Sequence, residues 1–295
     1  MSVTVAVETA ANNAVGTLKH MLIPFGAFSV DYAATPGMRG QVIQVPVVGA
    51  ITGNQTENSY EQGSSSVSKV DVTLNKYQQA PLAYTDVEQQ QLEDVAWLQP
   101  HIEEAMYQVG YNMMRDIMSE VTAANFTLDP VTCAAAAFDY DQVVDIRTQA
   151  AKDKFPMQPG MLSLLMTPDY HGALLKDTKI SNNLGIGGTP LTQGQLPNVA
   201  GFVLRESGAI PDNSESLVGM AVAKSAIGIA IRPTVPGQAS EGQVDFVTVT
   251  DPATGATFTI RIHYSAATGT THINVECRYG YELVDGTRGI RIKSE

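Results

Sequence analysis

Residues 102–121 have the sequence IEEAMYQVGYNMMRDIMSEV, and this stretch contains the strongest secondary-structure pattern in the chain. Pro100, just before it, is suited to the first turn of a helix. The pattern predicts one helix over about residues 100–124, roughly 37 Å long, as the dominant element of the fold. Its apolar side chains recur every three or four residues, the spacing of one helix face: Ile102, Met106, Val109, Met113, Ile117 and Val121.

The residues before this helix predict a long two-stranded hairpin. Residues 41–48 (QVIQVPVV) are apolar and β-branched, and residues 67–74 (VSKVDVTL) alternate so that Val70, Val72 and Leu74 share one face. Pro46 confines the first strand to a sheet edge or a bulge. Between them, residues 51–66 are polar and rich in Gly and Ser, which predicts a loop. Because an isolated hairpin is marginal in water, we expect it to pack on another surface, such as a neighbouring subunit.

Two shorter patterns flank the hairpin. Thr85 and Glu88 have the spacing of a capping box, which predicts a short helix over residues 86–92. Residues 1–38 are rich in Ala, Thr and Asn with weak periodicity. They predict an extended arm with one short helix near residues 12–21.

The second half of the chain predicts mixed α and β structure followed by β structure, and the whole chain is therefore classed as α+β. Asp139 or Asp141 caps a helix that runs to about residue 151, and residues 161–166 form a buried strand. A helix follows over residues 167–175, and a strand over residues 202–206. Residues 218–229 fit a strand, a turn or a helix. The closing strands are expected at residues 244–249, 257–263, 273–279 and 289–293.

Composition narrows the class of function. The 295 residues include 18 Lys and Arg against 30 Asp and Glu, a net charge of −12, which argues against sequence-specific nucleic-acid binding. Only 16% of the residues are charged, whereas about 25% is typical of soluble domains. Interface cores are depleted in charged residues, so this composition indicates that much of the surface meets other protein. The 44% hydrophobic content excludes a disordered chain.

The sequence also predicts where the product resides. No segment approaches the roughly 18 apolar residues of a membrane helix, and the N-terminus lacks the basic and apolar regions of a signal peptide. Cys133 and Cys277 lie too far apart for a zinc or redox motif. We therefore expect two reduced thiols in a soluble intracellular product.

No constellation of residues predicts catalysis or a cofactor. The glycine-rich residues 185–188 lack the Lys-Ser/Thr pair of a phosphate loop, so a loop is expected. His263 and His272 flank a hairpin-like turn and could approach each other, but a metal site would need a third ligand such as Glu276 or Cys277. Cross-strand surface residues are the simpler interpretation. We predict no catalytic residue, no cofactor and no metal site, and no enzyme.

The order of the elements resembles that of the major capsid proteins of tailed double-stranded DNA bacteriophages, the Hong Kong 97-type fold, and residues 258–292 are similar to the closing strands of podovirus-type coat proteins. The resemblance rests on VDVTLNKYQQAPLAYTDVEQQQLEDV (70–95), on residues 102–121, and on FTIRIHYSAATGTTHINVECRYGYELVDGTRGIRI (258–292). It implies an N-terminal arm (1–38), an E-loop hairpin (39–84), a P-domain with the long spine helix (85–135), a mixed α/β A-domain (136–238), and closing P-domain strands (239–295).

The resemblance further implies a shell protein that assembles into pentamers and hexamers around a double-stranded DNA genome. Its expected partners are itself, a separate scaffolding protein, a portal, and in some members a decoration protein. The DNA is enclosed without sequence-specific contacts, and no membrane is involved. The chain would be part of the virion after assembly in the host cytoplasm. An encapsulin-type nanocompartment shell protein is the nearest alternative, and a β-rich adhesin or an enzyme are more distant ones.

The family's E-loop covers the adjacent subunit, so the hairpin of this chain is where intersubunit contacts are expected. Lys69 and Lys76 are also candidates, by position alone, for the covalent cross-link that some members form. The predicted contact residues are Val45, Val47, Tyr60, Glu61, Lys69, Val70, Val72 and Lys76.

Overall fold

The long helix is present as α3 (Val95–Met118) in the computed structural model. The structure describes residues 3–14, 16, 22–48, 67–88, 94–183, 196, 198–234, 244–251 and 255–295. Asp94 caps α3 by accepting a hydrogen bond from the Ala96 N–H at 3.0 Å. Pro100 therefore lies inside the helix and not at its start. Both predicted boundaries are wrong by several residues, because Asp94 starts the helix earlier and the Ser119 hydroxyl, which donates to the Asp116 carbonyl, ends it earlier.

The predicted apolar stripe of this helix is confirmed. Ile102, Met106, Val109, Met113 and Ile117 are fully buried, and Val121 is buried just beyond the helix end. Polar side chains such as Glu104 and Asn112 occupy the exposed face. The 3.6-residue period therefore identified the buried face correctly, although the sequence alone placed the helix ends poorly.

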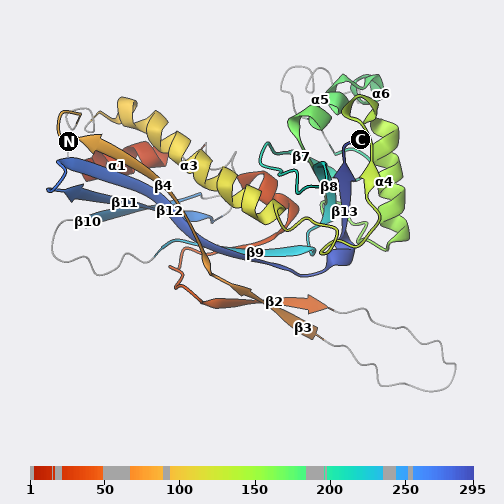
Figure 1. Cartoon of the computed structure of the whole chain (residues 1–295), viewed down its shortest axis with the longest axis horizontal. Helices are drawn as coiled ribbons and strands as arrows, with labels where there is room; N and C mark the ends of the chain where they lie inside the picture. The colour runs from red at the N-terminus through yellow and green to blue at the C-terminus, as the bar shows by residue number, and fades with distance from the viewer. Residues whose placement is uncertain are drawn as a thin grey trace.

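Helix α3 lies across one face of a six-stranded sheet (Figure 1). β12, the longest strand of this sheet, pairs with β11, β9 and β4, all antiparallel. The predicted closing strands are confirmed as β10, β11, β12 and, in the second lobe, β13 (Gly289–Lys293). The six strands are β1 (Ser29–Tyr32), β4 (Lys76–Thr85), β9 (Ile227–Arg232), β10 (Val244–Thr250), β11 (Thr257–Ser265) and β12 (Thr270–Leu283).

Strand β4 is an element that the sequence patterns did not identify, although it pairs with β12 over its whole length. Within the described residues, β12 is its only partner in the sheet, so β4 is an edge strand. The Asp86 N–H donates to the Gly269 carbonyl at 3.0 Å, and backbone groups alternate in direction along a strand. Even-numbered residues of β4 therefore bond to β12, whereas Pro81 faces the free edge. Its missing N–H costs no ladder hydrogen bond there.

The N-terminal helix lies earlier in the chain than predicted. α1 (Val3–Asn13) packs against α3 and β10, whereas the sequence favoured a helix near residues 12–21 within an extended arm. Residues 17–21 are outside the described part of the chain. The buried side chains of α1 are small, and they follow helical spacing that the uniformly Ala-rich segment obscured: Ala6, Val7, Ala10 and Ala11.

A second lobe surrounds a five-stranded sheet with the order β5-β13-β8-β6-β7 (Figure 1). Asp139 caps helix α4 (Tyr140–Lys152), as predicted, by accepting from the Asp141 and Gln142 N–H groups. Residues 218–229, which the sequence left open, contribute to two strands. The remaining elements of this lobe are β5 (Val131–Thr132), β6 (Leu162–Met166), α5 (Pro168–Lys176), α6 (Thr178–Asn183), β7 (Val203–Glu206) and β8 (Leu217–Ala223).

Strand β6 joins the two lobes. All five of its side chains are buried. Leu164 packs in the core of the second lobe, whereas Leu165 packs in the core that contains α3. A strand that is buried on both faces has an uninterrupted run of apolar residues. This run is the reason that the sequence predicted β6.

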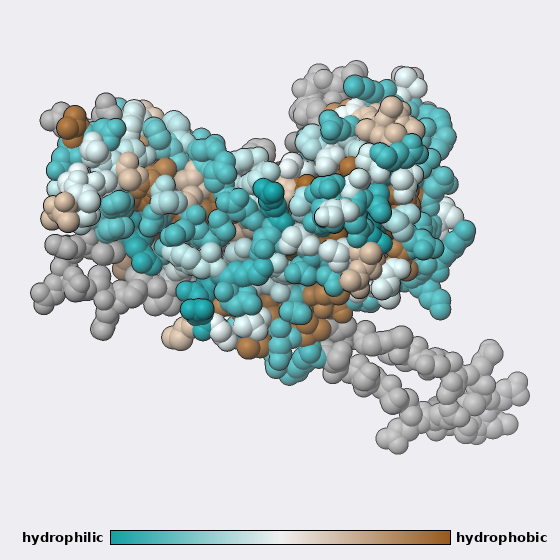
Figure 2. Space-filling model, in the orientation of Figure 1, coloured by the Kyte–Doolittle hydropathy of each residue, from teal (hydrophilic) through white to brown (hydrophobic). Residues whose placement is uncertain are grey.

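The predicted hairpin strands are confirmed as β2 (Val42–Val48) and β3 (Val67–Thr73), paired antiparallel from Val42↔Thr73 to Val48↔Val67. The hairpin projects away from both lobes (Figure 1). Met38 and Val42, next to its base, are 70% and 47% exposed. Figure 2 shows apolar surface near the point where the hairpin leaves the body. The predicted loop at residues 51–66 is outside the described residues.

The two predicted free thiols are confirmed, since Cys133 and Cys277 are both buried and unpaired. None of the helices in the described ranges combines the length and the hydrophobicity required to cross a membrane.

Gly280 on β12 is expected to be essential because it allows the base of the hairpin to pack closely against the sheet. A Cβ at this position would lie 2.1 Å from the Thr73 carbonyl oxygen, so Gly280→Ala should destabilise the protein by about 1–3 kcal/mol through overpacking. Gly172→Ala in α5 is the control, since its Cβ meets nothing within 4 Å and helix propensity favours alanine. Equal denaturation midpoints for Gly280→Ala and wild type would contradict the close approach.

Candidate functional site

The first candidate site is the hairpin β2–β3, where the sequence predicted intersubunit contacts. Lys69 is exposed, and its ammonium group donates to the Gln44 side-chain oxygen at 3.0 Å. Val70 is half-buried. The side chains of Val45 and Val47 are outside the described part of the structure, as are Tyr60 and Glu61. Of the predicted contact residues on β2 and β3 whose side chains are described, Lys69 and part of Val70 are thus open to solvent.

Val72 does not lie where the intersubunit prediction placed it. Its side chain is fully buried in a small cluster with Leu74 and with Ala230 of β9. The alternation along β3 correctly placed Val72 and Leu74 on one apolar face. That face is covered by the chain's own six-stranded sheet, so Val72 is part of the subunit core and is unavailable to a neighbour.

Lys76 is likewise engaged inside the chain. Its ammonium group donates to the Asp116 carboxylate at 2.7 Å and to the Tyr281 hydroxyl at 2.6 Å, and it lies 4.2 Å from the centre of the Tyr281 ring. Asp116 also accepts from the Tyr279 hydroxyl at 2.8 Å. Lys76 is thus engaged within the subunit, where α3, β4 and β12 meet around its charge, while its intersubunit role stays a prediction.

The charges of this cluster shift the pKa values of its members. Burial disfavours the charged form of Lys76, but the hydrogen bonds to Asp116 and Tyr281 outweigh it and hold its pKa above the ordinary value. Burial, and then the Asp116 carboxylate, raise the pKa of Tyr279. Lys76 thus stays charged and Tyr279 stays neutral throughout the physiological range. The cluster fastens α3 to the sheet.

A second polar cluster surrounds Glu276 on the sheet face that is turned away from α3. The Glu276 side chain is fully buried, and its carboxylate is 2.7 Å from the Arg261 guanidinium. It also accepts from the hydroxyls of Tyr77 and Thr234. Burial and this carboxylate raise the pKa of Tyr77. The sequence analysis considered Glu276 as a metal ligand, but the structure makes it the shared acceptor of three donors.

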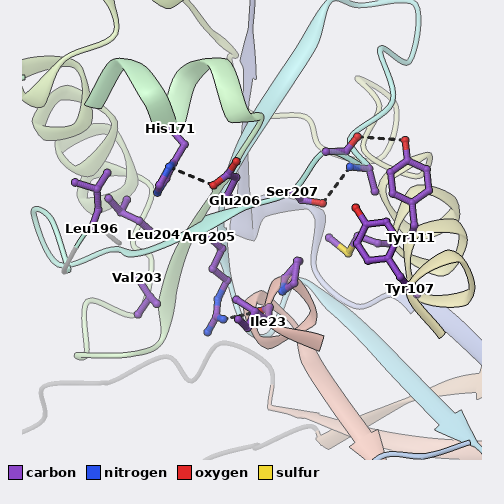
Figure 3. A pocket seen from close by; sticks show the side chains of 15 residues that line it. Ile23, Tyr107, Tyr111, His171, Leu196, Val203, Leu204, Arg205, Glu206 and Ser207 are labelled. Atoms are coloured by element: carbon purple, nitrogen blue, oxygen red, sulfur yellow. Dashed lines mark hydrogen bonds and ion pairs between the residues drawn. The ribbon is translucent and has the colours of Figure 1, made fainter. Parts of the chain in front are cut away.

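A pocket lies between the two lobes (Figure 3). It has a volume of about 560 Å3 and is formed by α3, by the 3-10 helix η1 (Pro24–Ala27), and by β7 with the residues that follow it. Tyr107 and Tyr111 stand on its α3 side, with ring centres 6.2 Å apart. The Tyr111 hydroxyl donates to the Gly208 carbonyl at 3.3 Å. No sequence pattern indicated this pocket, because its walls are far apart in the chain.

Several polar side chains of the pocket have partners within its walls. His171 of α5 lies 3.3 Å from the Glu206 carboxylate (Figure 3), and burial lowers the His171 pKa although Glu206 opposes the shift. The Arg205 guanidinium donates to the Ile23 carbonyl, and burial lowers its pKa. Nucleophilic catalysis requires a nucleophile within reach of a base, and no hydrogen bond in the described residues joins His171 to a hydroxyl or thiol.

The two histidines of the closing strands do come together. His263 and His272 are directly opposite on β11 and β12, with ring centres 4.7 Å apart. Among the described residues, no group of three or more potential ligands is placed to hold a metal ion. The pair is therefore a cross-strand contact, as the simpler interpretation had it.

Solved structures of phage proteins share this architecture. No protein-family model and no curated protein matches the sequence. The capsid structure of cyanophage P-SCSP1u aligns with a TM-score of 0.56 and 12% identity over 91% of this chain and 86% of that chain. The bacteriophage PhiM1 mature capsid aligns at 0.51 and 12% over 92% and 86%. A structure from Gordonia phage Cozz aligns at 0.53 and 11% over 93% and 86%.

At these identities the likeness concerns the fold. It extends over nearly the whole chain, both lobes included, and this chain has the fold found in phage capsid structures. The resemblance to phage capsid proteins inferred from the order of elements is thereby confirmed at the level of fold.

Proposed function

We propose that this chain is the major capsid protein of a tailed bacteriophage and forms the icosahedral shell around its double-stranded DNA. The observation that supports this most is the fold shared with phage capsids over more than nine-tenths of the chain. In this proposal α3 is the spine helix of a Hong Kong 97-type P-domain, the second lobe is the A-domain, and the hairpin β2–β3 is the E-loop.

The hairpin gives the proposal a physical basis. A two-stranded sheet alone is marginally stable, and within the described residues the base of this one packs on the subunit through Val72 and Leu74. Lys69 and Val70, and beyond them Val45, Val47, Tyr60 and Glu61, are proposed to contact the adjacent subunit. The low charged content, 16%, suits a chain with extensive protein interfaces.

The proposed partners follow from this function. Further copies of the chain form pentamers and hexamers, and a separate scaffolding protein and a portal direct their assembly. The acidic chain, with a net charge of −12, would hold packaged DNA without strong binding, because phosphates are retained by clustered Lys and Arg. An encapsulin-type shell protein remains the second candidate, since it would have the same fold and a protein cargo in place of DNA.

The purified chain is expected to form pentamers, hexamers or closed shells. Analytical ultracentrifugation at micromolar concentration, followed by negative-stain microscopy, tests this directly. Nuclease-protected double-stranded DNA inside particles from infected cells would favour the capsid over the encapsulin. A compact species of 31.5 kDa as the only product, with and without scaffold, would contradict both.

Deleting residues 52–66 and closing the hairpin with a short turn should separate folding from assembly. The subunit is expected to fold with a nearly unchanged melting temperature, because Val72 and Leu74 at the hairpin base remain in place. Particle yield on a sucrose gradient should fall strongly, because the overlap with the neighbour is lost. Shells of normal yield and stability would remove the main physical support for the proposed interface.

A further inference from the structure

The histidine pair of the closing strands lies near the end of the six-stranded sheet, two residues before the turn that joins β11 to β12. His263 of β11 and His272 of β12 are in direct register, and their rings are stacked, with 4.7 Å between centres and 13° between planes. They occupy the face of the sheet that is turned away from α1 and α3. Two neutral imidazoles stack favourably in this arrangement. Two imidazolium ions at the same distance would repel each other.

The groups that face the pair do not neutralise a second positive charge. On β11, Arg261 is two residues from His263, on the same face, and adds a further positive charge. On β12, the nearest carboxylate on this face is Glu276, which already accepts from Arg261, Tyr77 and Thr234.

The neighbouring strands β4 and β10 place few negative charges near the histidine pair. On β4 the residue opposite His272 is Ala83. At the end of β4, the Glu88 carboxylate accepts from the Thr85 N–H and hydroxyl, each at 2.9 Å. On β10, Val244 lies opposite His263 and Phe246 opposite Arg261. Among the described residues, the other charged groups on this face of the sheet are Arg261 on β11, Glu276, Arg278 and Glu282 on β12, and Arg232 on β9 with its ion-pair partner Asp31 on β1. At the end of β4, Asp86 accepts from the hydroxyl of Tyr264, the neighbour of His263, at 3.1 Å.

His263 itself lacks a polar partner for one of its nitrogens. Its Nδ1 atom is buried, and no residue in the described part of the chain accepts from it or donates to it. Burial, the neighbouring His272 and Arg261 all lower the pKa of His263. The unfolded chain therefore binds a proton at a higher pH than the folded chain does at this position.

We propose that the stacked pair His263–His272 is an acid-sensitive latch between β11 and β12. In the folded protein the two rings are stacked, and the stack helps to hold β11 and β12 together. On acidification, protonation of His263 beside His272 and Arg261 places like charges together, the rings separate, and the turn end of the β11–β12 pairing loosens. The stabilisation is complete above the ordinary histidine pKa of about 6.5 and is lost as the pH falls through the lower folded-state value.

The contacts of β12 connect the His263–His272 pair to the rest of the subunit. β12 pairs with β4 and with β9 as well as with β11. The opposite face of β12 contacts α3, and its Tyr279 hydroxyl is bonded to Asp116 of that helix. Loosening β11 from β12 therefore weakens the support of the longest helix. This inference concerns the subunit alone and holds whether or not the proposed function is correct.

The test measures the pKa of individual histidines in the full-length protein by exchange of the imidazole C2 hydrogen, followed by mass spectrometry. His272→Asn should raise the pKa of His263 toward the ordinary value. His171→Asn is the matched control: it removes another buried histidine with a lowered pKa, in the second lobe, and should leave His263 unchanged. If the Asn variant does not fold, His272→Gln provides the same measurement.

A second measurement follows stability. The melting temperature of the wild type should fall between about pH 7.5 and about pH 5. In His272→Asn and in the double variant His263→Asn/His272→Asn, this fall should be smaller by about 3 °C. An unchanged His263 pKa in His272→Asn would overturn the proposal. So would a double variant that loses as much melting temperature in acid as the wild type does.

Discussion

Replacing Ile117 by aspartate is expected to abolish soluble, folded protein. Ile117 is fully buried on the apolar stripe of α3. An unpaired carboxylate at this position costs several kcal/mol, and total domain stability is only about 5–15 kcal/mol. Expression and solubility, with circular dichroism of any soluble fraction, measure the outcome.

The control for this experiment is Asn112→Asp. It places the same carboxylate on the same helix, but at an exposed position, and surface substitutions usually change stability by about 0.5 kcal/mol or less. Soluble Ile117→Asp protein that melts within a few degrees of wild type would mean that α3 does not pack through this face.

Glu276→Ala is expected to produce the next largest loss. The carboxylate is fully buried and is shared by Arg261, Tyr77 and Thr234. Removing one partner of a buried ion pair leaves the others desolvated and unpaired, which costs about 3–5 kcal/mol. For a chain of this size that corresponds to roughly 10 °C or more in melting temperature.

Two further variants locate the origin of this loss. Glu282→Ala removes a carboxylate from an exposed position of the same strand and should leave the melting temperature almost unchanged. Glu276→Gln keeps the size and one acceptor oxygen, so it should fall between wild type and Glu276→Ala. If Glu276→Ala melted like Glu282→Ala, the three donors would have to be satisfied by other groups.

Local periodicity determined several elements of this protein. The stripe of α3, the alternation of β3 and the apolar run of β6 are each set by the sequence within a few residues, because burial of one face imposes a period of 3.6 or 2. The order of these elements was sufficient to reveal the resemblance to phage capsid proteins. The element boundaries were less certain: the Asp94 cap and the buried small residues of α1 gave weak local signals.

Only the tertiary structure decided what each buried face packs against. Alternation placed Val72 on an apolar face, but the covering residue, Ala230, lies far away in the sequence and belongs to the same chain. Lys76 meets Tyr281 across 205 positions, and Glu276 meets Thr234 across 42. A period reports that a face is buried and carries no information about its partner. The partner depends on how distant strands pair, so the polar clusters at the centre of this fold follow from strand register, which local sequence does not specify.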